Sequence, residues 1–165
     1  MYLGEIVRLM MLDLIDRELL FVEDMKKNSY RHALFTKGSF YTKYLNEIES
    51  DTSQELNKTK RILKELTGIE NPTLEDCSVV KCLCNAVTKR AAKLTAAGLA
   101  VILKRMNKSD VTIAVDGSLF RYHPRLQIIM ENTLKNLINP LNKFQIVLST
   151  DGSGKGAAVV AAVVA

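Results

Sequence analysis

The sequence predicts a helix-rich α/β fold with two strands. Residues 111–115 and 144–149 are short apolar runs that contain β-branched side chains, which is the composition of buried strands. Each run leads into a glycine-bearing turn, at 116–118 and at 151–156, and helical periodicity covers most of the remaining chain. We therefore expect both strands to be hidden from solvent and each to end in a sharp turn.

Helical periodicity predicts the elements around the two strands. The expected helices are residues 2–20, 40–49, 54–66, 74–108, 124–137 and 157–165. Ser53 and Thr73 are suitable N-caps for the third and fourth of these helices. Residues 21–38 have no clean period and read as a connection with one short turn. The last helix contains only alanine and valine, so we expect it to be buried.

Composition suits one folded domain and argues against several classes of function. The chain has 165 residues, 47% of them hydrophobic and 25% charged, with a formal net charge of +5. It has no long run of like charges, so neither nucleic-acid nor membrane-surface binding is expected. No apolar run reaches the roughly 20 residues that span a bilayer. Cys77, Cys82 and Cys84 have no histidine near them, so we expect reduced thiols in a cytoplasmic protein and no metal site.

The two glycine turns have the features of phosphate-binding turns. Glycine lets the backbone turn tightly and a ligand approach closely. Ser118 and Ser153 add hydroxyl groups, and a helix that starts at the second turn adds free N–H groups at its positive end. The second turn is not a Walker loop, because position 149 is Ser and Lys155 is followed by Gly156. No dinucleotide fingerprint follows either strand. Two ordinary loops remain the alternative.

Both turns resemble segments of the eukaryotic hexokinase family. Residues 115–120 with His123-Pro124 resemble the family's adenosine-side turn, and residues 151–158 resemble its last phosphate-side loop. Three further matches occur in the family's order and spacing, at residues 2–8, 48–51 and 90–100. The resemblance implies that residues 1–165 are the C-terminal portion of a hexokinase large domain. Its fold is that of an actin-like, ribonuclease H-like ATPase with a mixed sheet, most of whose strands would precede Met1.

The resemblance also implies an activity and a set of contacts. The complete enzyme would transfer the γ-phosphate of ATP, with Mg²⁺, to the 6-hydroxyl of glucose or a similar hexose. The implied nucleotide-binding residues are Gly117, Ser118, Leu119, Phe120, Thr42 and Asn46. The implied phosphate-binding residues are Ser153, Gly154, Lys155 and Gly156, which in the family also meet the hexose 6-phosphate product. Tyr41 and Asn46 depart from the family pattern, which often has an acidic residue and Ser there, so a solvated helix face is the alternative for that segment.

Nothing in the chain resembles the family's catalytic aspartate, its sugar-binding segments or its first phosphate loop. We therefore expect the 165 residues alone to be inactive and both ends to be truncated. Asp116 is expected to orient its turn, and His123 to be structural instead of a general base. Apolar surface left exposed would favour self-association. The parent enzyme is expected in the cytoplasm, where association with the mitochondrial surface is also compatible with the resemblance.

Two other functions compete with this interpretation. The chain could be a non-catalytic helical interaction or regulatory module whose glycine turns are only turns. It could also belong to another actin-like ATPase, such as a chaperone. The Asp-Gly-Ser sequence at 116–118 and the Ser-Gly-Lys-Gly-Ala sequence at 153–157 favour the hexokinase branch by resemblance.

Overall fold

The structure is a computed structural model that describes residues 2–25 and 33–164. The chain divides into two compact units, Met1–Arg90 and Ala91–Ala165, and each is described by itself. The middle of the connection predicted at 21–38 lies outside the described residues.

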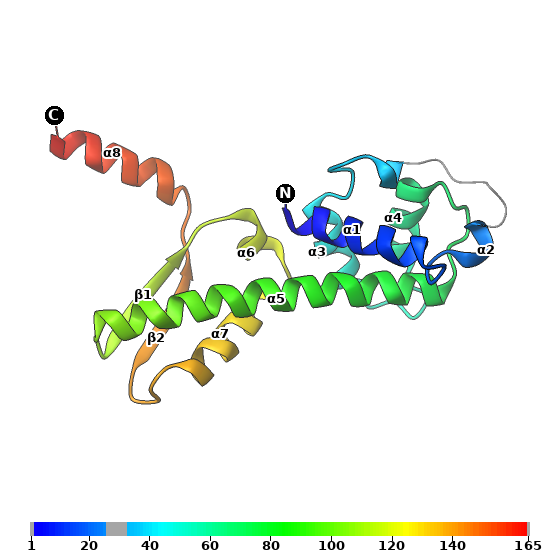
Figure 1. Ribbon diagram of the computed structural model, residues 1–165. Coiled ribbons are helices and arrows are strands. Elements are labelled where there is room, and N and C mark those ends of the chain that lie inside the picture. The colour runs from blue at the N-terminus through cyan, green and yellow to red at the C-terminus, as the bar shows by residue number, and fades with distance from the viewer. Residues whose placement is uncertain (1, 26–32, 165) are drawn as a thin grey trace. The chain divides into compact units, whose positions relative to one another are not determined.

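The first unit is entirely helical in its described part. It contains α1 (Tyr2–Asp16), α2 (Val22–Met25), a 3₁₀ turn η1 (Ala33–Phe35), α3 (Thr42–Glu49), α4 (Asn57–Thr67) and the first half of α5 (Leu74–Met106) (Figure 1). Its core is continuous and includes Met11, Phe40, Leu45, Leu63 and Cys84. The helices begin and end where local chemistry allows. Gly68 closes α4 in the left-handed region at φ 74°, and Thr73 Oγ1 caps α5 by accepting the Asp76 N–H at 3.0 Å.

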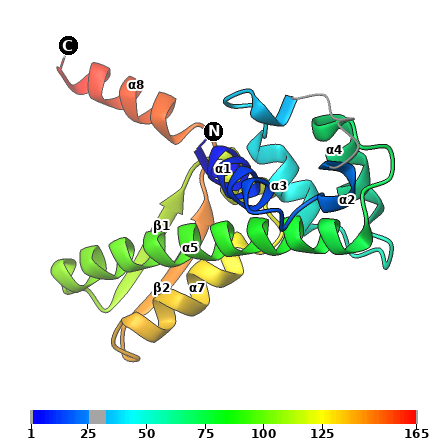
Figure 2. The same cartoon turned by 45° about the vertical axis from the view of Figure 1, so that its right-hand side comes forward.

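The second unit is a small α/β layer. It contains the rest of α5, then β1 (Asp110–Val115), α6 (Ser118–Tyr122), α7 (Leu126–Leu137), β2 (Lys143–Leu148) and α8 (Gly152–Val164). The two strands are parallel and pair from Asp110 with Lys143 to Val115 with Leu148. Parallel strands need a crossover, and α6 and α7 provide it. Figure 2 shows α5 and α7 beside the strands, and Ala96, Leu103, Ile113 and Leu134 form one of the clusters between these layers.

Most predicted elements are confirmed, with shifted boundaries. The helix predicted to reach residue 20 ends at Asp16, and the one predicted from residue 54 begins at Asn57. The N-cap is Leu56, so the prediction of Ser53 as N-cap is wrong, although Ser53 Oγ still accepts the Asn57 N–H at 3.0 Å. The last helix begins at Gly152, five residues earlier than predicted from residue 157, and the short helix α6 was not predicted.

The predicted burial of the strands and of the last helix is wrong. In β1 only Ile113 is buried, and β2 and α8 contain no buried residue. The strand residues that point toward α5 and α7 are partly covered, and those on the opposite face are open. Helices that pack on one side of a two-stranded sheet cover only one of its two faces. The apolar composition of these segments indicates a preference for burial, but no other part of the described chain covers the open face of the sheet or α8.

No helix in the described part of the chain combines the length and the apolarity needed to cross a membrane. The three cysteines are free, and burial raises the pKa of Cys77 to about 11 and that of Cys84 further still. Those two thiols are therefore protonated and unreactive at neutral pH.

Candidate functional site

The two glycine turns adjoin at one edge of the sheet. Because β1 and β2 are parallel and in register, both strands end at the same edge. The pairing continues one step further, as the Ser149 N–H donates to the Val115 carbonyl at 2.8 Å. The Gly152 N–H then donates to Asp116 Oδ2 at 2.9 Å. Asp116 therefore joins the first turn to the second, which is the orienting role that the sequence suggested.

The first turn requires glycine and is anchored by the residues that follow it. Gly117 has φ 137° and ψ 146°, a backbone conformation that residues with a Cβ rarely adopt. Ser118 begins α6 and is exposed. Phe120 is buried with Ala92, and Leu119 packs against the same cluster. Gly117 and Ser118 thus face solvent, while Leu119 and Phe120 hold the turn on the core of its unit.

The second turn opens α8 with exposed backbone. Asp151 is in the left-handed region at φ 55°, and its carbonyl accepts the Lys155 N–H at 3.0 Å. A Cβ on Gly154 would lie 2.5 Å from Asp151 Oδ1, so the aspartate side chain lies over this glycine. Ser153, Gly154, Lys155 and Gly156 are all exposed.

The electrostatics of this edge are mixed. The N-terminus of the 13-residue α8 carries a partial positive charge, and Lys155 adds a cation. Asp116 and Asp151 add carboxylates at the same turns. No group of three or more His, Cys, Asp or Glu side chains in the described chain is arranged to hold a metal ion. One or two carboxylates beside phosphate groups are, however, the usual environment of Mg²⁺, so the residues present fit an ion held mainly by a nucleotide.

His123 has a structural role. Its Nδ1 accepts the N–H groups of Arg125 at 3.2 Å and Leu126 at 3.1 Å. The ring therefore caps the start of α7, and Nδ1 is occupied as an acceptor. This arrangement agrees with the structural interpretation of His123 and leaves that nitrogen unsuited to act as a base.

Thr42 and Asn46 belong to the first unit and lie one turn apart on the same face of α3. Thr42 Oγ1 and Asn46 Oδ1 are buried, as is Ser39 Oγ just before the helix, and none of these atoms has a hydrogen-bond partner within the described residues. A fully solvated helix face is therefore the wrong description of this segment. The exposed ring of Tyr41 instead lies under the Lys43 ammonium, 5.5 Å from it.

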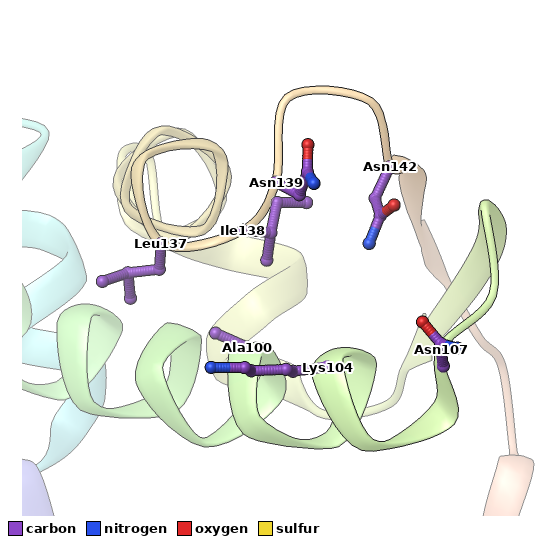
Figure 3. Close-up of a pocket in the computed structure, with 7 residues that line it drawn as sticks. All are labelled: Ala100, Lys104, Asn107, Leu137, Ile138, Asn139 and Asn142. Carbon is purple, nitrogen blue, oxygen red and sulfur yellow. The ribbon is translucent and has the colours of Figure 1, made fainter.

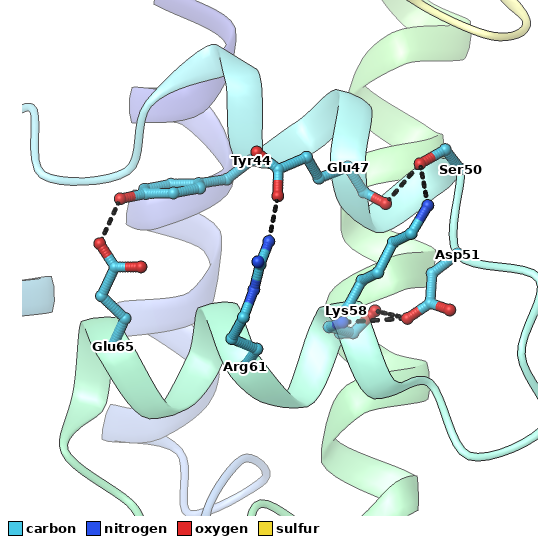
Figure 4. Close-up of polar contacts among 8 residues, drawn as sticks. Tyr44, Glu47, Ser50, Asp51, Lys58, Arg61 and Glu65 are labelled. Atoms are coloured by element: carbon cyan, nitrogen blue, oxygen red, sulfur yellow. Dashed lines mark hydrogen bonds and ion pairs between the residues drawn. The ribbon is translucent and has the colours of Figure 1, made fainter.

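The opposite side of α3 is fixed to α4 by polar contacts (Figure 4). Tyr44 donates to Glu65 at 2.9 Å, and Arg61 pairs with Glu47 at 2.6 Å. Burial, together with the Glu65 carboxylate, raises the pKa of Tyr44 to about 12, so its hydroxyl stays a donor. The two pairs lie about one turn apart in the interior of α3, and they hold this helix to α4.

The match at 48–51 has a structural role, which sequence reasoning missed. Asp51 is 1% exposed and accepts hydrogen bonds from Ser53 and Thr59. Burial alone would raise its pKa, but these hydrogen bonds outweigh burial and hold the pKa below its usual range. Glu49 accepts the Thr88 hydroxyl of α5 at 2.5 Å. The signal available in the sequence was the acidic residue Asp51, which stands two residues after Glu49 at the end of an expected helix.

A cavity of about 360 Å³ lies in the second unit, away from the turns (Figure 3). It is at the amino ends of the strands, since Asn107 and Asn142 stand just before β1 and β2. The other lining residues are Ala100, Lys104, Leu137, Ile138 and Asn139. No pattern in the sequence indicated this cavity.

Comparison with known proteins decides the family. A family model described as hexokinase matches residues 1–163. This chain belongs to the hexokinase family. Human Hexokinase HKDC1 is 43% identical over 169 residues, which cover 99% of this chain and 17% of that protein. The Schistosoma mansoni hexokinase is 39% identical over 164 residues, which cover 98% of this chain and 35% of that protein.

The fold comparison agrees. The solved structure of the Schistosoma mansoni hexokinase, described as complexed with glucose, matches with a TM-score of 0.88 at 38% identity. The match covers 98% of this chain and 35% of the solved chain. The helix-rich α/β fold of the hexokinase, actin-like ATPase type is therefore confirmed. The two strands described here are parallel, so they do not display the mixed sheet. The chain spans about a sixth to a third of the length of these relatives.

Proposed function

We propose that this chain forms the nucleotide and phosphate side of a hexokinase, which transfers the γ-phosphate of ATP to the 6-hydroxyl of glucose or a similar hexose. The observation that carries the proposal is the pair of glycine turns at neighbouring strand ends, joined by the hydrogen bond from Gly152 to Asp116. Two turns at one edge can hold successive parts of one nucleotide. Family membership and the glucose complex of the Schistosoma mansoni relative support the choice of reaction and substrate.

The chemistry asked of these residues is positioning and charge stabilisation. Phosphoryl transfer develops charge on the phosphate oxygens, and fixed donors stabilise it. The N–H groups of Ser153 and Gly154 are at the positive end of α8, and Lys155 can add a point charge. Ser118 offers its hydroxyl from the first turn. A bound Mg²⁺ would neutralise phosphate charge, with Asp116 and Asp151 as the nearby carboxylates.

The remaining implied contacts have unequal support. Leu119 and Phe120 are packed on their own unit, so their part is to hold the first turn beside the adenosine and to present backbone. Thr42 and Asn46 each hold a buried polar oxygen without a partner in the described chain. Such an oxygen costs about 1–3 kcal/mol until a donor reaches it, which favours a ligand there. Gly156 has open space around it, so a packing role does not account for it.

We further propose that the 165 residues alone do not phosphorylate hexose, since no segment of the sequence resembles the family's sugar-binding segments or its catalytic aspartate. The apolar side chains of Val159, Val160, Val163 and Val164 on α8 are at least 62% exposed. Such a surface favours self-association of the isolated chain. Cytoplasmic residence of the parent enzyme, with ATP, hexose and hexose 6-phosphate as its partners, belongs to the same proposal.

Calorimetric titration with Mg-ATP tests the nucleotide role. Gly117→Val should weaken binding about tenfold or more, because it is strained at φ 137°, and Gly154→Val should weaken it less, because it displaces the Asp151 side chain and adds bulk at the turn. Gly98→Ala is the matched control: it places a Cβ in open space on α5 and should leave affinity unchanged. Unaltered affinity in both valine variants would favour the interaction-module alternative. Hexose-dependent ATP consumption by the 165-residue chain would contradict its inactivity.

A further inference from the structure

The entry into α3 is held by two charged residues of α1. Glu5 Oε2 accepts the Gly38 N–H at 2.9 Å, and Glu5 Oε1 accepts from Arg8 at 2.7 Å. Arg8 is 5% exposed and donates its other terminal nitrogen to the Leu34 carbonyl at 3.0 Å. The pair therefore fastens both ends of the loop from Leu34 to Gly38, which leads directly into α3.

A glycine lets α1 come close enough for these contacts. A Cβ on Gly4 would lie only 2.1 Å from the Phe40 carbonyl oxygen, so α1 lies directly against the backbone that enters α3. Phe40 is buried and packs edge-on against Tyr44, with ring centroids 5.7 Å apart. The position of the first turn of α3, which carries Thr42, is thus set by α1.

Buried Leu34 also anchors this loop in the core, and Glu5 and Arg8 add the polar contacts that reach it from α1. Within the loop, the Thr36 N–H donates to the Ala33 carbonyl and the Ser39 N–H to the Thr36 carbonyl, both of them local turn bonds. The far end of α3 is anchored separately, where Glu49 accepts from Thr88. Loss of the Glu5 and Arg8 contacts would therefore loosen the loop that enters α3, while the pairs with α4 and the Glu49 contact keep the rest of the helix in place.

We propose that Glu5 is a positioning residue for the nucleotide: through Arg8 and Gly38 it holds the start of α3 so that Thr42 and Asn46 keep their places. This inference rests on the proposed function, which makes those two residues nucleotide contacts. The hydrogen bonds from Arg8 and from the Gly38 N–H lower the pKa of Glu5 to about 2. The carboxylate is therefore charged at physiological pH and can accept both hydrogen bonds.

Glu5→Gln in the complete hexokinase polypeptide tests the role. The amide keeps the size of the side chain but turns one oxygen into a donor, which faces the N–H of Gly38 or the guanidinium of Arg8. The KM for ATP should rise about tenfold, with the KM for hexose and kcat within about twofold of wild type. Gly4→Ala disturbs the same entry by collision without changing charge, so it should move the KM for ATP in the same direction.

Asp13→Asn is the matched control on the same helix. Asp13 pairs with Arg17 four residues later on the same helix, whereas Glu5 and Arg8 are three apart, and the Asp13 and Arg17 side chains are both exposed. It should change neither KM. All variants are assayed well below the midpoint of thermal unfolding followed by circular dichroism, so that the folded fraction is constant.

The outcomes separate this inference from the proposed function. Glu5→Gln with a lower melting midpoint but an unchanged KM for ATP overturns the positioning role and leaves the nucleotide site standing. An equal rise in both KM values also overturns it, since a general loosening would do that. A wild-type protein whose activity does not depend on ATP overturns the proposed function, and the inference with it.

Discussion

The two units differ in how completely they bury their own apolar residues. The first unit closes a continuous core and buries its charged motif residues in hydrogen bonds. The second unit covers one face of a two-stranded sheet, and α8 contains no buried residue. Family-like motifs therefore do different work in the two: at 2–8 and 48–51 they lock helices together, and at 115–120 and 151–158 they shape an open edge. A shared motif does not by itself indicate a ligand contact.

Core truncation should give the largest contrast between the units. Leu63→Ala, at a fully buried position in the first unit, should lower the free energy of unfolding by about 2–5 kcal/mol. Val160→Ala on exposed α8 should change it by less than about 0.5 kcal/mol. Urea denaturation followed by circular dichroism measures both. Equal effects would show that α8 is covered, for example in an oligomer.

Acid should weaken the first unit through its buried carboxylate. Asp51→Asn removes the charged acceptor of the Ser53 and Thr59 hydrogen bonds and should cost about 2–3 kcal/mol at neutral pH. The folded-state pKa of Asp51 is below its ordinary value of 3.8, so its contribution is complete above that pH and is lost as the pH falls through the lower folded value. The contribution of Glu5 to stability is likewise complete above about pH 4.5 and is lost as the pH falls towards about 2.

The measurement is the urea midpoint as a function of pH. The Asp51→Asn profile should be shallower than wild type on the acid side. Parallel profiles for the two proteins would mean that Asp51 is not the group that titrates.

A substitution that raises helix propensity should have the smallest effect on the free energy of unfolding, and it should increase that free energy. Gly98 lies inside α5, is exposed, and has open space where a Cβ would be. Gly98→Ala should therefore stabilise the protein by about 0.5–1 kcal/mol without changing any contact. Thermal unfolding checks the sign. A lower midpoint would indicate that the small residue is needed where α5 meets another surface.

Local chemistry made much of the fold predictable. Periodicity placed α5 and α7 closely, β-branched runs placed both strands, and Thr73 caps α5 as expected. The five-residue α6 is too short to show a period. Burial of α8 could not be predicted, because composition states what a segment prefers and not what covers it.

The candidate site was predictable in part. The need for glycine at 117 follows from a tight turn after a strand, and the structure shows the positive φ that requires it. The clamp of Glu5 and Arg8 on residues 34–38 was not predictable, since it depends on how α1 packs against a loop some 30 positions later. Contacts between distant segments leave no trace in a local pattern.

The bond between Asp116 and Gly152 has a consequence for divergence within the family. The carboxylate of Asp116 in one turn accepts the backbone N–H of Gly152 in the other, 36 positions later, so the shapes of the two turns depend on each other. A substitution that changes the shape of one turn for a different nucleotide also moves the other turn. The residues of the two turns are therefore expected to vary together among natural sequences.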